Sequence, residues 1–253
     1  SAVQKIIAAL DLRSGETVIE IGPGKGALTI PLAEKCAEVG AKLIAIEKDG
    51  ELAKSLELRV DSSQIITGDA LKELPNFLSS YQLQALPTGQ AGTSYKLVGN
   101  IPFYITGALL RVISELPIKP RVTVLMIQKE VAQRLCAKPP QMNLLAAATQ
   151  IWAEPKLLFT LPPSDFEPEP QVKSAVIELR SEKSELKVDE LKNYYRTIKI
   201  LFKQPRKTLF NNLRDGGVEP EIARVLIAKL GLSERARPQD LSIDQCRSIA
   251  DEL

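Results

Sequence analysis

The sequence predicts an α/β protein in which a seven-stranded sheet is followed by a small all-helical C-terminal domain. Short runs rich in β-branched residues alternate with stretches that carry apolar residues at helical spacing, which is typical of a sheet with helices on both faces. After Arg180 the strand-like runs stop and helix-forming residues dominate. A chain of 253 residues, 44% hydrophobic and 25% charged, is long enough for one sizeable core and a small second domain.

The predicted strands are short and bounded by turn-forming or charged residues. They cover 18–21, 42–46, 64–67, 96–99, 122–127, 156–161 and 174–179, the last two forming a hairpin. Helices are predicted over 26–39, 50–58, 106–116 and 129–137, and then over 189–202, 206–213, 219–229 and 243–253. Polar residues 79–94 predict a surface loop, and residues 183–185 a linker. We therefore expect one domain over residues 1–181 and a second over 182–253.

Composition excludes several classes of chemistry. Histidine is absent, which removes the usual general base and the commonest metal ligand. Cys36, Cys136 and Cys246 are far apart and in no metal-ligand spacing, so we expect reduced packing residues and no metal site. No apolar run approaches a membrane span, and no secretory signal is recognisable. We expect a cytoplasmic monomer without a membrane partner.

A glycine-rich turn follows the first predicted strand. Glu20 opens it, and Gly22, Gly24 and Gly26 let the backbone approach a nucleotide-like ligand. The glycines alone fit a nicotinamide dinucleotide as well as S-adenosylmethionine. The acidic Glu20 favours a cationic ligand such as S-adenosylmethionine.

Two carboxylates follow the next two strands. Glu47 can accept both ribose hydroxyl protons of an adenosine group, and the alternative is a solvated glutamate paired with Lys48. Asp69 can accept from an adenine amine, and the alternative is an aspartate that caps a turn. The neighbours Lys48 and Ala70 complete the predicted cofactor contacts.

The turn after the fourth predicted strand, Asn100-Ile101-Pro102-Phe103, favours methyl transfer to an adenine amine. That nitrogen is a poor nucleophile because its lone pair is delocalised into the ring. The Asn100 side-chain carbonyl and the Ile101 backbone carbonyl could hold its two protons and push it toward tetrahedral geometry. Pro102 would fix the turn, and Phe103 offers a ring for an extruded base, worth roughly 1–3 kcal/mol. The alternative is an ordinary turn with a core phenylalanine.

These residues resemble the ribosomal RNA adenine dimethyltransferases that modify the 3′ end of small-subunit RNA. The resemblance runs along nearly the whole chain. It is carried by the glycine loop extended by Ala27-Leu28-Thr29, by Gly68-Asp69-Ala70, by Asn100 to Thr106, by Gln128 to Arg134, by Phe166 to Ala175 and by Arg206-Lys207-Thr208-Leu209.

The resemblance implies a Rossmann-like methyltransferase sheet and a role for each motif. It places Gly22 against the methionine part of the cofactor, Glu47 on its ribose and Asp69 on its adenine amine. It makes Asn100 catalytic and implies that Phe166 closes on the base opposite Phe103, in a loop stiffened by Pro168 and Pro170.

The chain departs from the family in two places. Phe103 stands where the family usually has tyrosine, which matters little because stacking needs only the π-face. The family also has a Gln-Asn-Phe-Leu-like segment just upstream of the helix that here begins at Ser1. We expect bound cofactor to be less enclosed without that segment, and the activity of this chain to depend on it.

A basic stretch near the C-terminus predicts an RNA contact. Residues 191–214 hold seven cations and no acidic residue, namely Lys192, Arg196, Lys199, Lys203, Arg206, Lys207 and Arg214. A helix would place the first four along one side, where a phosphate backbone could lie. We assign substrate binding to Lys199, Lys203, Arg206 and Lys207 together with Phe103 and Phe166. The alternative is a solvated helix face.

The predicted function is transfer of methyl groups from S-adenosylmethionine to the exocyclic N6 of adenines near the 3′ end of small-subunit rRNA, giving N6,N6-dimethyladenosine. The partner would be that rRNA or the pre-ribosomal small subunit. Three alternatives stay open: a macrolide-resistance enzyme acting on large-subunit rRNA, a non-catalytic ribosome assembly or transcription factor, and a nicotinamide oxidoreductase.

Overall fold

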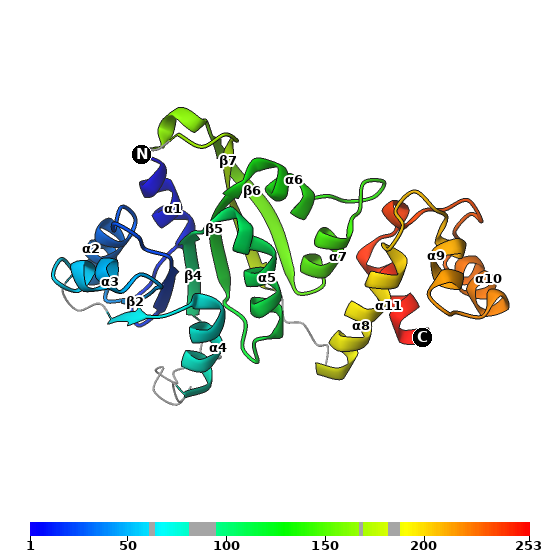
Figure 1. The fold of residues 1–253 in the computed structure, drawn as a ribbon. Helices are drawn as coiled ribbons and strands as arrows, with labels where there is room; N and C mark the ends of the chain where they lie inside the picture. Colours follow the sequence, from blue (N-terminus) through cyan, green and yellow to red (C-terminus); the bar gives the residue numbers. More distant parts are fainter. Residues whose placement is uncertain (61–63, 81–94, 167–168, 182–187) are drawn as a thin grey trace. The chain divides into compact units, whose positions relative to one another are not determined.

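The computed structural model describes residues 1–60, 64–80, 95–166, 169–181 and 188–253. Their elements, most of them labelled in Figure 1, are α1 (Ala2–Leu10), β1 (Thr17–Ile21), α2 (Thr29–Val39), β2 (Lys42–Glu47), α3 (Gly50–Glu57), β3 (Gln64–Thr67), α4 (Ala70–Ser80), β4 (Tyr95–Asn100), η1 (Phe103–Ile105), α5 (Thr106–Glu115), β5 (Val122–Gln128), α6 (Lys129–Leu135), α7 (Leu144–Gln150), β6 (Ala153–Leu161), η2 (Pro163–Asp165), β7 (Ser174–Ser181), α8 (Val188–Leu201), α9 (Leu209–Asp215), α10 (Pro220–Lys229), η3 (Pro238–Asp240) and α11 (Ile243–Glu252).

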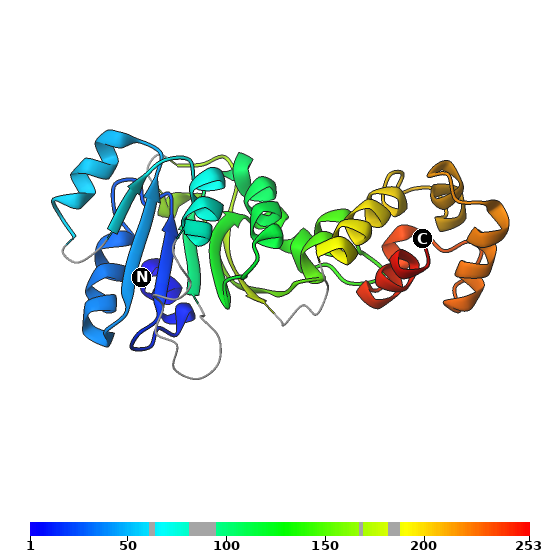
Figure 2. The same cartoon turned by 90° about the horizontal axis from the view of Figure 1, so that it is seen from below.

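The seven strands form one sheet in the order β3-β2-β1-β4-β5-β7-β6 (Figures 1 and 2). The five strands from β3 to β5 pair in parallel, and β7 pairs antiparallel with β5. Every residue of β1 is buried, as expected for the middle of a sheet covered on both faces. All seven predicted strands are confirmed, and β6 lies beside β7 at the sheet edge.

Helix ends differ from the predicted ones where backbone geometry intervenes. The helix predicted from residue 26 begins at Thr29, because Gly26 has a φ of +86° that no helical residue adopts. The helix predicted from residue 206 begins at Leu209, because the Thr208 side chain caps it by accepting from the Asn211 N–H. The sequence did not predict α4 or α7. Residues 79 and 80 of the predicted loop end α4, and residues 81–94 lie outside the described residues, as does the predicted linker 183–185.

The chain divides into two compact units. The first comprises Ser1–Ala132 and Lys156–Glu182, and the second Gln133–Pro155 and Lys183–Leu253. The second unit therefore includes α7, whose residues fall within the predicted first domain of residues 1–181. The physical reason is packing: Ala146 and Ala147 of α7 lie in one apolar core with Tyr194 of α8, whose hydroxyl donates to the Ala147 carbonyl at 3.0 Å.

The core of the first unit fixes one face of the sheet. Ile6 and Leu10 of α1 and Leu32 and Cys36 of α2 pack on alternate residues of the central strands, among them Val18, Leu43, Val98 and Val124. This apolar layer, here called the α1–α2 core, covers that face of the sheet. Cys36 and Cys246 are both buried, each in the core of its own unit.

Candidate active site

The predicted site residues converge where the order of strands reverses. β1 and β4 are adjacent in the middle of the sheet, and the chain crosses from β1 toward β3 on one side and from β4 toward β5 on the other. In parallel sheets the carboxyl ends of such strands leave a crevice in which ligands bind. The glycine loop leaves β1 at this point, and Asn100 is the last residue of β4.

The glycine loop has a backbone that only glycine adopts easily. Gly22, Gly24 and Gly26 have φ values of +66°, +56° and +86°. The Gly22 N–H donates to the carbonyl of Ile46 at 3.0 Å, and a Cβ added to Gly22 would lie 3.8 Å from the backbone oxygen of Asn100. The loop therefore passes directly beside the start of the Asn100 turn.

Glu47 is buried and organises this loop. Glu47 is 7% exposed. Its Oε2 accepts from the Gly24 N–H at 2.8 Å, and its Oε1 accepts from the Asp49 N–H at 2.9 Å. The alternative of a solvated glutamate paired with Lys48 is wrong, because the Lys48 Nζ lies instead 3.6 Å from Asp69 Oδ2. Each carboxylate oxygen has a second lone pair, so Glu47 can still accept from a ligand hydroxyl.

Asp69 stands at the start of α4. Its Oδ1 accepts from the Leu71 N–H at 3.0 Å, so the helix-capping contact is present. Its Oδ2 is the partner of Lys48, in an ion pair between side chains that are 37% and 76% exposed. Such an exposed pair is easily displaced. Ala70, the first residue of α4, is buried beside them.

Glu20 is a buried residue, and one of its carboxyl oxygens has no hydrogen-bond partner among the described residues. It is 1% exposed, and that oxygen is Oε2. Burial raises the pKa of Glu20 from 4.5 to about 7; the nearby Thr29 hydroxyl opposes this rise, and the charge of Glu47 adds to it. A positively charged ligand at this edge would favour the ionised form of Glu20.

The Asn100 turn is anchored by one buried residue, while its other residues are exposed or half-buried. Ile101 is 2% exposed, whereas Asn100 and Pro102 are exposed and Phe103 is half-buried. The Ile105 N–H donates to the Pro102 carbonyl at 3.1 Å, which closes the turn into η1. The burial of Ile101 therefore holds the turn while the Asn100 side chain stays accessible.

Strand alternation places the three polar side chains on one face. Glu20 is paired with Ala45 and Val98, two residues before Glu47 and Asn100 respectively. Residues two apart in a strand share a face, so Glu20, Glu47 and Asn100 all lie on the face of the α1–α2 core. Phe166 also packs against that core, half-buried. Its closure on a base opposite Phe103 stays a prediction, and Pro168 lies outside the described residues.

The basic residues belong to the second unit. Lys192, Arg196 and Lys199 are exposed along α8, with Lys203 just beyond its end, while the opposite side of α8 buries apolar residues. Lys207 is less free than expected, because its Nζ lies 3.1 Å from Asp215 Oδ2. Asp215 lies one residue beyond the basic stretch 191–214, which is why that stretch contains no acidic residue.

Sequence reasoning missed Arg59, which braces the glycine loop. Its Nη1 donates to the Lys25 carbonyl at 3.0 Å, across 34 residues of chain. No sequence signal marks it, because it lies beyond the end of α3 in no motif. Within the described residues, no group of three acidic, histidine or cysteine side chains could hold a metal ion, and no helix is long and apolar enough to cross a membrane.

Comparisons with known proteins identify relatives that match this chain along its whole length. The profile of the family described as "Ribosomal RNA adenine dimethylase" matches residues 1–253. "Ribosomal RNA small subunit methyltransferase A" of Koribacter versatilis is 38% identical over 100% of this chain and 90% of its own length. The protein of the same name from Lactobacillus acidophilus is 34% identical over 98% of this chain and 85% of its own.

Solved structures share the fold. A dimethyladenosine transferase from Plasmodium falciparum superposes with a TM-score of 0.76, at 21% identity over 99% of this chain and 94% of its own. The 23S rRNA methyltransferase ErmE gives 0.72, at 21% identity over 100% of this chain and 96% of its own. At these identities the likeness establishes a Rossmann-like methyltransferase fold and does not by itself distinguish the RNA substrates.

Proposed function

This chain belongs to the ribosomal RNA adenine dimethylase family, and we propose that it transfers methyl groups from S-adenosylmethionine to N6 of adenines near the 3′ end of small-subunit rRNA, giving N6,N6-dimethyladenosine. The observation that carries the proposal is the close approach of the glycine loop to the Asn100 turn, where a Cβ added to Gly22 would lie 3.8 Å from the Asn100 backbone oxygen, so that a glycine-rich backbone lies beside two amide acceptors. The small-subunit relatives favour this substrate over the large-subunit alternative.

The donor set fits S-adenosylmethionine. Glu47 and Asp69 offer acceptors for ribose hydroxyls and an adenine amine, while the buried, unpartnered Glu20 oxygen suits a cationic ligand. A nicotinamide dinucleotide would place phosphates beside these acidic groups, which disfavours the oxidoreductase alternative. When bound, S-adenosylmethionine would supply a methyl group on a positively charged sulfur; transfer to N6 would leave neutral S-adenosylhomocysteine and release one N6 proton to solvent.

The chain's own residues prepare the nitrogen for this transfer. The Asn100 side-chain oxygen and the Ile101 carbonyl accept hydrogen bonds from the N6 amine and turn its lone pair toward the incoming methyl. Phe103, with Phe166 on the other face, holds the base by stacking, and these rings also exclude water from it. No imidazole and no metal are required. The intact carboxylates and Asn100 disfavour a non-catalytic factor.

The finer proposals concern the partner. The exposed cations Lys199, Lys203 and Arg206 contact the phosphate backbone and position the substrate without reading its sequence. Lys207 joins them only if it leaves Asp215. We further propose a cytoplasmic monomer that acts on small-subunit rRNA or its pre-ribosomal particle.

The decisive experiment is radiolabelled methyl transfer to unmethylated small subunits and, in parallel, to large-subunit rRNA, followed by digestion to nucleosides. We expect label in dimethyladenosine from the small subunit alone. Label confined to large-subunit RNA would overturn the proposed substrate, and label absent from both would overturn the enzyme.

A further inference from the structure

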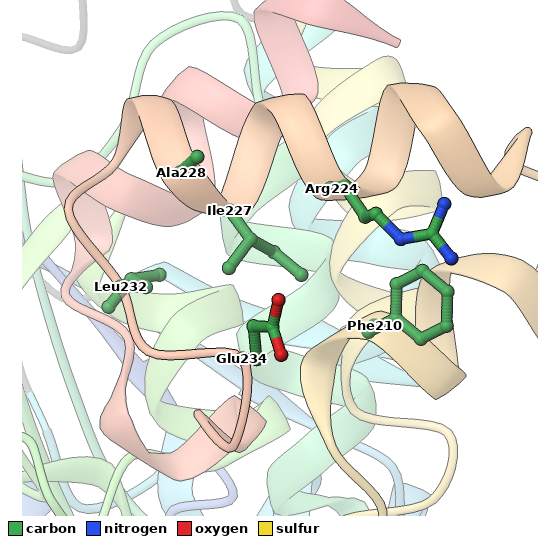
Figure 3. A pocket seen from close by; sticks show the side chains of 6 residues that line it. All are labelled: Phe210, Arg224, Ile227, Ala228, Leu232 and Glu234. Carbon is green, nitrogen blue, oxygen red and sulfur yellow. The ribbon is translucent and has the colours of Figure 1, made fainter.

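A pocket in the helical unit lies outside the residues discussed above. It has a volume of about 370 Å³. Figure 3 shows its lining, which comes from α9, α10 and the segment after α10: Phe210, Arg224, Ile227, Ala228, Leu232 and Glu234. All six residues belong to one compact unit, so the pocket does not depend on how the two units are arranged.

One wall of the pocket is a stacked cation and ring. The Arg224 guanidinium carbon lies over the Phe210 ring, 5.3 Å from its centre, and Figure 3 shows the two side chains next to each other. Arg224 is also held by Glu221, whose Oε2 lies 3.1 Å from its Nη1. Ile227, which is buried, adds an apolar side chain to the lining of the pocket. Flat guanidinium and aromatic groups of this kind stack on unpaired RNA bases.

The other wall carries an unpaired carboxylate. Figure 3 shows the Glu234 side chain directed toward the space between Ile227 and Phe210. Glu234 is exposed, and neither a salt bridge nor a side-chain hydrogen bond engages its carboxylate among the described residues. Both of its oxygens are therefore available as acceptors beside a flat, cationic wall.

We propose that this pocket binds an unpaired guanine base of an RNA strand. Guanine carries N1–H and the N2 amine on one edge, which match the two oxygens of a carboxylate, whereas adenine, cytosine and uracil offer a carboxylate fewer donors on that edge. The pocket is near the lower end of the range for small-ligand sites, which suits one base rather than a folded peptide. The proposal rests on the proposed function in that it takes RNA as the partner, and it adds a base-reading site to backbone contacts that carry no sequence information.

The test compares guanosine with inosine, which lacks only the N2 amine. The full chain is titrated with fluorescently labelled single-stranded oligoribonucleotides that differ by one guanosine-to-inosine replacement. The variant Glu234→Gln is measured beside Glu219→Gln, which removes the same charge from an exposed carboxylate of the same unit that does not line the pocket.

We expect the parent chain to bind the guanosine oligomer about ten-fold more tightly than the inosine oligomer, the loss expected for one hydrogen bond to a charged group. Glu234→Gln should bring that ratio close to one, and Glu219→Gln should keep it. Removing a negative charge raises RNA affinity on electrostatic grounds alone, so a fall in guanosine binding for Glu234→Gln is specific to the pocket.

Equal binding of the two oligomers by the parent chain, or tighter guanosine binding by Glu234→Gln, would overturn the proposal. The methyl-transfer assay on the parent chain separates this outcome from failure of the proposed function. A chain that methylates small-subunit rRNA but ignores the inosine replacement refutes only the pocket. Guanine selectivity without methyl transfer refutes only the proposed reaction.

Discussion

Glu20→Gln should make the sheet-containing unit more stable at high pH while weakening its site. The carboxyl is buried, its Oε2 has no partner among the described residues, and burial raises its pKa to about 7. The amide of glutamine has nearly the same shape but does not ionise. The substitution therefore removes the cost of a buried negative charge with little change in packing.

The size and sign follow from the two pKa values. In the folded chain the pKa is about 7, against 4.5 for the ordinary carboxyl. Below pH 4.5 both states are protonated and the group costs nothing. As the pH rises toward 7 the unfolded state ionises first, so the folded parent loses stability, up to about 3 kcal/mol at about 1.4 kcal/mol per unit of pKa. From about pH 5.5 to 8, the variant should gain about 2 kcal/mol over the parent.

Hydrogen exchange of β1 amides, measured by mass spectrometry under native conditions, reports this free energy for the first unit alone. Parent and Glu20→Gln are compared at about pH 5.5 and about pH 8. The control is Glu57→Gln, which changes an exposed glutamate of α3 and should give the same stability difference from the parent at both pH values. A stability difference between parent and Glu20→Gln that is the same at both pH values would refute the reasoning. S-adenosylmethionine affinity, measured by calorimetry, should fall in the more stable variant.

Three further predictions test other parts of the structure. Asn100→Ala should lower methyl transfer by about 100-fold or more without shifting the thermal midpoint, because the side chain is exposed; an unchanged rate would disprove its catalytic role. Glu47→Gln should weaken S-adenosylmethionine binding about ten-fold in calorimetry, because the two Glu47 oxygens accept from the N–H groups of Gly24 and Asp49, and the NH2 group of glutamine cannot accept from either; an unaltered Kd would contradict this. Tyr194→Phe should lower the free energy of unfolding of the helical unit by about 1 kcal/mol in urea, since it deletes the bond to the Ala147 carbonyl; equal stability would show that the bond contributes nothing.

Local sequence patterns were enough to predict the strands and to place the site residues at or near the strand ends. Glu47 and Asn100 end their strands and Glu20 lies one residue before the end of its own, and parallel strands carry such ends to one edge of a sheet. The helices α4 and α7 were not predicted from the sequence. α4 contains Pro75, which argues against a helix interior, and α7 has only seven residues, too few to show helical spacing of apolar residues over several turns.

The sequence by itself determined the fold class, the family and the residue types at the site, because periodicity and short motifs are properties of neighbouring residues. Only the tertiary structure decided which partners those residues take. It buried Glu47 against the Gly24 N–H, paired Lys48 with Asp69 instead, and stacked Arg224 over Phe210. Hydrogen bonds and ion pairs between residues far apart in sequence depend on distances that only the folded chain sets.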